Sequence, residues 1–147
     1  MKIDKLYNGL KRIANGDYVL EGDLISEETI EVDLDDRLVV KGKIQTKKSI
    51  VVRFGIEAGD GIKAGCGIEA GWGIKAGCGI EAGWGIEAGW GIEAKTFISV
   101  KKRIFAGISI YSASDDCDKS IRCAELRGGE ICYGDLLLTK EAQNDKH

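Results

Sequence analysis

GIEAGD GIKAGC GIEAGW GIKAGC GIEAGW GIEAGW GIEAKT is the sequence of residues 55–96, in which a six-residue unit occurs seven times in succession. The period extends on both sides of this tract, because an Ile, Leu or Val recurs at every sixth position from Val32 to Ile110. A short unit repeated at a fixed period is typical of an architecture in which each unit stacks on its neighbours. The repeat therefore predicts a solenoid.

Each hexad predicts one short strand followed by a corner. The residue two positions after the aliphatic one is alanine in all seven central copies, and the residue between them is Glu or Lys. Side chains alternate across a strand, so the aliphatic residue and the alanine are expected to face a core and the charged residue to face water. The Gly-x-Gly that follows is expected to form the corner, because glycine can adopt a positive φ.

The charges indicate how many hexads complete one coil. With three hexads per coil, three of the four stacked central pairs are opposite in sign: Glu57–Lys75, Lys63–Glu81 and Lys75–Glu93, with Glu69–Glu87 as the exception. With two hexads per coil, four of five pairs would have like charges, which are destabilising when they lie directly opposite on neighbouring strands. A coil of three strands is therefore predicted, and the aliphatic column makes between four and five coils.

This pattern resembles the hexapeptide-repeat β-helices, whose triangular coils carry an aliphatic residue at every sixth position. The resemblance covers residues 32–112. The segments VLEGDL at 19–24 and VVKGKI at 39–44 also resemble the bactofilin-type polymer-forming solenoids in their pattern of glycine and aliphatic residues. Both resemblances imply an all-β fold, a single-stranded parallel β-helix. The first family is left-handed and the second right-handed, and the hexad spacing does not decide between them.

The two ends of the chain depart from the hexads and are expected to cap the solenoid. Residues 1–16 are predicted to form a helical cap, with one apolar face made by Ile3, Leu6, Tyr7, Leu10 and Ile13. Residues 17–112 form the repeat, which is regular from residue 32 and slipped or irregular before it. Residues 113–139 are predicted to form a hairpin-like cap or a flap, with two strands about Arg127-Gly128-Gly129, and residues 140–147 a tail.

The composition narrows the classes of function. The chain has 147 residues, a net charge of −3 and no apolar run long enough for a membrane span, so one soluble domain is expected. The negative charge does not favour direct nucleic-acid binding. The five cysteines are an odd number and lack CxxC spacing, which indicates free thiols in a reducing cytoplasm rather than disulfides or a zinc site.

Catalysis is not expected from the residue types present. The hexapeptide acyltransferases that this chain resembles use a histidine as general base, and the related solenoid carbonic anhydrases bind a metal through three histidines. The only histidine here is His147, in the polar C-terminal tail. No G-x-S-x-G, P-loop or metal-ligand motif occurs. The sequence therefore predicts no catalytic residue, no cofactor and no metal site.

One column of the three-hexad coil is a candidate partner-binding edge, made of Phe54, Trp72, Trp90 and Ile108. Exposed aromatic side chains are favoured anchors of protein interfaces. The alternative is that the rings only cover the glycine corners and shield the backbone. Trp84 falls in a different column, with Lys48, Cys66 and Lys102, and is expected to serve local packing.

A second candidate surface is acidic, made of Glu21, Asp23, Glu27, Glu28, Glu31, Asp33, Asp35 and Asp36. Five basic residues and no acidic one follow between Lys41 and Arg53. One interpretation is a polar first coil that meets a complementary second coil. The other is an acidic surface that engages a basic, nucleic-acid-binding protein.

These observations leave three hypotheses for function. The first is a non-catalytic scaffold that binds protein partners and self-associates through the aromatic edge as a homo-oligomer. The second is an inhibitor, such as one from a phage or mobile element, that occupies a basic site on another protein. The third is a catalytically degenerate relative of the hexapeptide acyltransferases.

Overall fold

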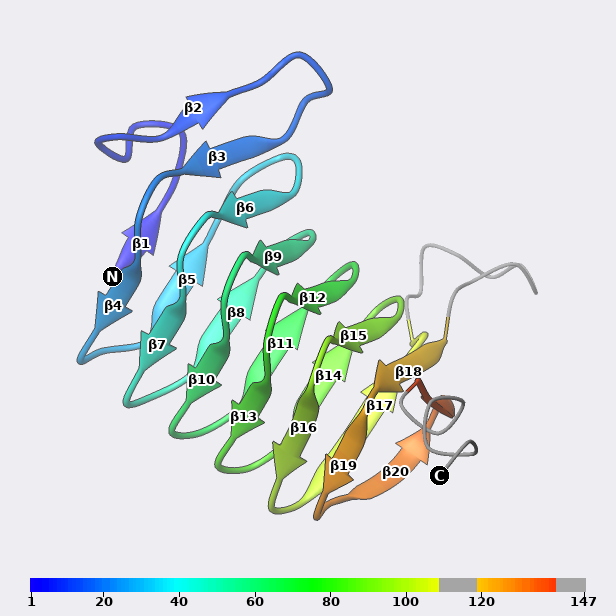
Figure 1. The fold of residues 1–147 in the computed structure, drawn as a ribbon. Helices are drawn as coiled ribbons and strands as arrows, with labels where there is room; N and C mark the ends of the chain where they lie inside the picture. Colours follow the sequence, from blue (N-terminus) through cyan, green and yellow to red (C-terminus); the bar gives the residue numbers. More distant parts are fainter. Residues whose placement is uncertain (109–118, 140–147) are drawn as a thin grey trace.

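The computed structural model describes residues 1–108 and 119–139, which form a parallel β-solenoid with no helix in that part of the chain (Figure 1). The coils are three-sided, with one strand on each side. The first three coils consist of β3 (Tyr18–Leu20), β4 (Leu24–Ser26) and β5 (Ile30–Val32); β6 (Leu38–Val40), β7 (Ile44–Thr46) and β8 (Ile50–Val52); and β9 (Ile56–Ala58), β10 (Ile62–Ala64) and β11 (Ile68–Ala70).

The next three coils continue the same winding. They consist of β12 (Ile74–Ala76), β13 (Ile80–Ala82) and β14 (Ile86–Ala88); β15 (Ile92–Ala94), β16 (Phe97–Val100) and β17 (Arg103–Ala106); and β18 (Ser120–Cys123), β19 (Glu125–Arg127) and β20 (Glu130–Tyr133). A further strand, β21 (Asp135–Leu138), follows at the C-terminal end. Two short strands, β1 (Lys2–Ile3) and β2 (Lys11–Arg12), precede the first coil.

Strands from successive coils stack into three sheets, which are the three faces of the rod (Figure 1). Sheet A has the order β1-β5-β8-β11-β14-β17-β20, sheet B has β2-β3-β6-β9-β12-β15-β18-β21, and sheet C has β19-β16-β13-β10-β7-β4. In the repeat, partners are three hexads apart, as Ile56 and Ile74 are. The predicted pairs Glu57–Lys75 and Lys63–Glu81 are therefore neighbours in register, and the second has an Nζ–Oε2 distance of 3.8 Å.

The core is the narrow interior that the three sheets enclose. Every strand from β9 to β15 begins with a buried isoleucine and ends with a buried alanine, while the Glu or Lys between them faces outward. The predicted inward and outward columns are confirmed. The aliphatic column forms an uninterrupted ladder, and alanine at the second buried position leaves room for the branched side chain.

The first coil is longer than the prediction allowed. Leu38 lies opposite Tyr18, so this coil exceeds three hexads by two residues, because five residues connect β5 to β6 where three connect the later strands. Leu34 turns into the core from this connection. Val32 therefore pairs with Val52 in the alanine column and not, as predicted, in the aliphatic column. In the first coil the aliphatic column is occupied by Leu24 and Ile30, in register with Ile44 and Ile50.

The predicted N-terminal helix is wrong. Residues 1–16 contain β1, which pairs parallel to β5, and β2, which pairs antiparallel to β3. Asp4 Oδ1 accepts a hydrogen bond from the Leu6 amide, and Gly9 has a φ of 90°, so local turns replace helical hydrogen bonds. Only Ile3 of the proposed apolar face is fully buried, and Leu6 is almost fully exposed. A short segment without tertiary packing of a whole face does not hold a helix.

The predicted C-terminal hairpin is also wrong. β19 and β20 flank Gly128 and Gly129 as expected, but they pair with β16 and β17 of the preceding coil and not with each other. The residues in register with the isoleucine ladder are Ile121, Leu126, Ile131 and Leu136, which are five residues apart; the last of them, Leu136, is exposed at the end of the rod. The solenoid therefore continues with shorter steps. The predictions for residues 109–118 and for the tail at 140–147, including His147, lie outside the described residues.

Candidate interaction surfaces

The predicted aromatic column is a continuous stack at the corner between sheets A and B, which we call the aromatic corner. The Trp72 and Trp90 rings are parallel to within 3° with their centroids 5.2 Å apart, and Phe54 meets Trp72 edge-on at 4.7 Å. Their backbones form a ladder, since the Trp72 amide donates to the Phe54 carbonyl and the Trp90 amide to the Trp72 carbonyl. Offset-stacked and edge-to-face rings at such distances attract each other.

The aromatic corner is open to solvent along its length. Trp90 has 39% of its surface exposed, and Phe54, Trp72 and Ile108 are half-buried. A groove of about 320 Å³ runs beside Trp72 and Trp90 on the outer face of sheet B, where Lys75 and Glu93 also line it. The structure thus brings all four predicted residues to one edge and joins that edge to a groove.

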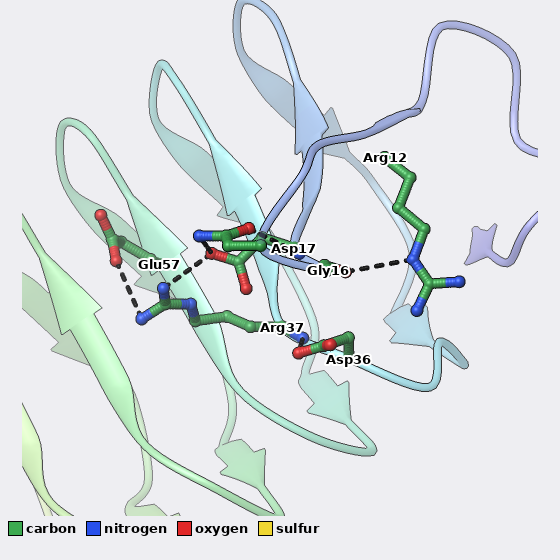
Figure 2. Close-up of polar contacts among 7 residues, drawn as sticks. Arg12, Gly16, Asp17, Asp36, Arg37 and Glu57 are labelled. Atoms are coloured by element: carbon green, nitrogen blue, oxygen red, sulfur yellow. Dashed lines mark hydrogen bonds and ion pairs between the residues drawn. The ribbon is translucent and has the colours of Figure 1, made fainter.

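Asp17, Asp36 and Arg37 line the same groove and belong to a polar network. Figure 2 shows the contacts of this network. Arg37 donates from Nη2 to Asp17 Oδ2 at 2.7 Å and approaches Glu57 Oε1 at 3.5 Å. Asp17 is nearly buried and also accepts from the Asn15 side-chain amide. Beside them, Arg12 Nε donates to the Gly16 carbonyl. Charge-assisted hydrogen bonds fix the relative orientation of the groups that they join. Because Arg37 contacts both Asp17 and Glu57, the turn after β2 is held against the second and third coils.

The eight predicted acidic residues do not gather on one face. Glu21 and Asp23 lie at the corner between sheets B and C, and Glu27 and Glu28 at the corner between sheets C and A. Glu31 lies on sheet A itself. Three others are in the long connection from β5 to β6: Asp33, Asp35 and Asp36. The acidic residues therefore encircle the first coil.

Basic side chains of the next coil form ion pairs with three of these eight acidic residues. Lys47 Nζ lies 3.2 Å from Glu27 Oε1, and Lys48 Nζ lies 3.1 Å from Glu28 Oε2. Arg53 Nη1 lies 3.4 Å from Asp33 Oδ1. All of these side chains are largely exposed, where an ion pair contributes about 0–1 kcal/mol. The geometry corresponds to the first interpretation above, a polar coil that meets a complementary second coil.

Asp35 is the acidic residue most strongly perturbed by its neighbours. The Tyr18 hydroxyl donates to Asp35 Oδ1 at 2.7 Å, and Lys5 Nζ lies 3.0 Å from Oδ2. The hydrogen bond from Tyr18, followed by the contact with Lys5, lowers the pKa of Asp35 from 3.8 to about 2. Both interactions favour the ionised carboxylate in the folded state.

Acid is therefore expected to weaken the anchoring of the N-terminal segment. Because the folded-state pKa is depressed, Asp35 stabilises the fold fully above about pH 4, and this contribution is lost as the pH falls from about 4 through 2. Tyr18→Phe should reduce the slope of melting temperature against pH between about pH 4 and 2. The same substitution should leave that slope unchanged at pH 6–8. Thermal unfolding of both proteins between pH 2 and 8 measures it, and identical slopes below pH 4 would contradict the assignment.

The structure gives Trp84 a different place from the expected local packing. It stands at the corner between sheets C and A with 58% of its surface exposed, and Lys102 Nζ lies 5.7 Å from the ring centroid. A hollow of about 880 Å³ lies beside it on sheet A, lined in part by Val51, Phe105 and Arg103. The coil length of three hexads predicts that Trp84 lies in a column with Lys48 and Lys102, but it gives no sign that a hollow adjoins this corner.

The described cysteines are free thiols with different surroundings. Cys123 is buried and Cys66 half-buried, whereas Cys78 and Cys132 are exposed. A hydrogen bond with Asp60 raises the pKa of Cys78, and burial raises the pKa of Cys123, so both favour the neutral thiol. Within residues 1–108 and 119–139, the side chains of His, Cys, Asp and Glu do not form a group of three that could hold a metal ion.

Searches against protein-family models, curated proteins and solved structures found no match to this chain. The six coils with regular isoleucine strands are consistent with a hexapeptide-repeat β-helix. No helix in the part of the chain that the structure describes is long and apolar enough to cross a membrane.

Proposed function

We propose that the protein is a non-catalytic β-solenoid scaffold that binds a second copy of itself through the aromatic corner. The supporting observation is the stack of Phe54, Trp72 and Trp90, which presents ring surface to solvent beside a groove. Tryptophan is among the residues that contribute most binding energy when an interface excludes water from it. Stacking fixes the rings before association, so little side-chain entropy is lost on binding.

The scaffold is preferred to the other two hypotheses for specific reasons. An inhibitor that engages a basic site needs one acidic face, whereas the acidic residues here surround the first coil, and three of the eight pair with Lys47, Lys48 and Arg53. A relative of the acyltransferases would need an activated group, and the perturbed thiols Cys78 and Cys123 have raised pKa values. The proposal therefore rests on the rigid rod and its aromatic corner.

Removal of the two stacked tryptophans is expected to weaken self-association. Trp72→Ala with Trp90→Ala should lower the dimerisation affinity at this edge by about tenfold or more, because two interface anchors are lost. Analytical ultracentrifugation over a range of protein concentrations measures the change. Trp84→Ala is the matched control, since it removes an even more exposed tryptophan from a different corner.

The two outcomes are distinct. The proposal requires the double variant to shift the sedimentation equilibrium toward smaller species while its circular dichroism stays that of a folded β protein. An unchanged equilibrium in the double variant would contradict the assignment of the interface to the aromatic corner. A wild-type protein that is monomeric at all concentrations would contradict self-association itself.

A further inference from the structure

The C-terminal end of the rod, opposite to β1 in Figure 1, presents three strand edges that we call the open end. β19 is the last strand of sheet C, β20 of sheet A and β21 of sheet B, and each pairs with the preceding coil on one side only. The amide and carbonyl groups on their outer sides therefore have no strand partner among the described residues.

The open end also leaves part of the core in contact with solvent. Leu136 is in register with the buried Ile121, yet 37% of its surface is exposed. Its neighbour Leu137 is 47% exposed, and the ladder residues Leu126 and Ile131 are only half-buried. An exposed apolar edge strand is a site at which a further strand pairs. The open end thus lacks both hydrogen-bond partners and a cover for its aliphatic residues.

The N-terminal end of the rod is closed by contrast. β1 pairs with β5 and carries the fully buried Ile3, and Tyr7 and Leu10 pack against the core from the turns that follow. β2 covers β3 in the antiparallel direction. The edges at this end on sheets A and B are strands of only two residues, β1 and β2. The N-terminal end of one copy therefore cannot continue the last coil of another on all three sheets.

The shape of the open end indicates what covers it. An extended peptide would pair with one edge and leave the other two and the interior uncovered. The segment 140–147, KEAQNDKH, contains no Ile, Leu, Val or Phe with which to extend the aliphatic ladder. Only another three-sided coil presents three edges around an apolar interior. Since the N-terminal end is closed, the surface that matches is the open end of a second copy.

We propose that two copies join through their open ends, with a two-fold axis perpendicular to the rods that passes through sheet A. In this arrangement, β20 pairs antiparallel with β20 of the second copy, and β19 of each copy pairs antiparallel with β21 of the other. An interface between identical patches related by a two-fold axis closes on itself, so the assembly stops at two copies.

The rise of the winding selects this axis. A coil of three strands rises by one strand spacing of about 4.8 Å, so each strand lies on average about 1.6 Å beyond the one before it. Of the last three strands, β19 is therefore the most recessed and β21 the most advanced, with β20 midway. The axis through sheet A places the most recessed edge opposite the most advanced one, and all three pairs then reach the same separation.

The other two axes do not close all three edges. An axis through sheet B pairs β21 with its equivalent but leaves β19 and β20 of opposite copies about twice the strand spacing apart. An axis through sheet C brings the β19 strands together only if β20 and β21 of opposite copies overlap. The axis through sheet A is the one that satisfies every edge.

The pairing of β19 with β21 continues the core from one copy into the other. With the strand centres opposed, Leu126 of one copy meets Leu138 of the other on the inner side. On the outer side, the aliphatic stem of Arg127 lies against Leu137, while its guanidinium stays in water. β20 contributes less, because a β-bulge interrupts its register opposite Ile104 and Phe105. Most of the contact therefore falls to the two pairs of β19 with β21.

Sedimentation tests the pairing in a parent that carries Trp72→Ala and Trp90→Ala, so that only the open end is measured. Leu137→Lys places a cation in the edge strand β21, opposite Arg127 of the second copy, and should weaken dimerisation at least about tenfold. Ile25→Lys is the matched control. Ile25 is the middle residue of the edge strand β4 at the other end of the rod, and it is 51% exposed against 47% for Leu137.

The outcomes separate the open end from the aromatic corner, which is a different surface. Dimers of the parent and of Ile25→Lys, but not of Leu137→Lys, support the inference, with circular dichroism to verify that each variant is folded. A monomeric parent overturns it and leaves the proposed function standing. Leu137→Lys that dimerises like the parent also overturns it. An equal loss with Ile25→Lys would show that the N-terminal end takes part, which the inference excludes.

Shape and cross-linking locate the axis independently. Small-angle X-ray scattering of the parent dimer should give a maximum dimension nearly twice that of the monomer, whereas rods side by side would leave the length almost unchanged. A short bis-maleimide should join Cys132 of β20 to its equivalent, as mass spectrometry of the digested dimer can show, because the axis passes through this strand and Cys132 is exposed. In a Leu137→Cys variant, linkage at residue 137 without linkage at Cys132 would place the axis on sheet B and overturn the arrangement.

Discussion

Ile74→Ala is expected to lower the free energy of unfolding by about 2 to 5 kcal/mol. Ile74 lies in the middle of the ladder between Ile56 and Ile92, and all three side chains are buried. The interior of a three-sided coil is only one side chain deep from each face, so the neighbouring coils cannot move inward to fill a void without breaking their hydrogen bonds. The cost should therefore include a cavity term as well as lost apolar burial.

Lys75→Ala is the matched control for this substitution. Lys75 is the next residue of the same strand but points outward, between Glu57 and Glu93. Its truncation removes only exposed cross-strand charge interactions, which contribute about 0–1 kcal/mol. Urea denaturation of both variants gives the comparison. A loss for Ile74→Ala no larger than that for Lys75→Ala would contradict the inward assignment of the isoleucine column.

The sequence was sufficient to predict the winding of the central coils because two independent patterns agree there. The buried isoleucine and alanine positions repeat in every hexad, and the charges between them distinguish a coil of three hexads from a coil of two. The structure has this register, with Lys63 beside Glu81. The aromatic corner followed from the same coil length, since Trp72 and Trp90 are three hexads apart.

The structure of the two ends could not be predicted, because aliphatic residues still fill the core there but the number of residues from one strand to the next is no longer six. The connection from β5 to β6 has two additional residues, and Leu34 fills the space that they enclose, which a search for fixed columns misses. At the C-terminal end the step falls from six residues to five, so Ile131 and Leu136 leave the column without leaving the fold. Near the N-terminus, helical spacing of apolar residues is outweighed by pairing of Ile3 with the edge strand β5.

The two candidate interaction surfaces were predicted only in part, because the coil length assigns residues to columns but does not show what lies beside each column. A coil length places residues in columns, and this was enough to assemble the aromatic corner. It does not say which columns border a hollow, so Trp84 was assigned to packing although it is exposed. The acidic run is continuous in sequence but passes all three sides of the first coil, because a strand of three residues carries the chain to the next face.

Gly77→Ala is expected to be destabilising, although the reason differs from the one that the sequence suggested. Positive φ was expected at the Gly-x-Gly corners, yet the described glycines with positive φ lie outside the central repeat: Gly9, Gly16, Gly22, Gly107, Gly128, Gly129 and Gly134. At Gly77 the constraint is the neighbouring coil. A β-carbon there would overlap the carbonyl oxygen of Gly59 and lie 2.9 Å from its carbonyl carbon.

Because both of those atoms belong to the backbone, the clash cannot be relieved by a side-chain rotation. The two coils would have to separate locally, which weakens the hydrogen bond from the Gly77 amide to Ala58. We expect a loss of about 1–3 kcal/mol in the free energy of unfolding, the usual cost of overpacking. Thermal and urea denaturation measure it.

Gly67→Ala separates this contact from a general effect of replacing glycine at a corner. Gly67 occupies the other glycine position of a Gly-Cys-Gly corner, and a β-carbon there would meet nothing closer than the Gly85 carbonyl oxygen at 3.6 Å, an ordinary contact. Alanine restricts the unfolded chain, so this variant should be neutral or more stable by about 0.4–1 kcal/mol. Equal destabilisation by both substitutions would mean that backbone conformation, and not the approach of the preceding coil, sets the requirement for glycine.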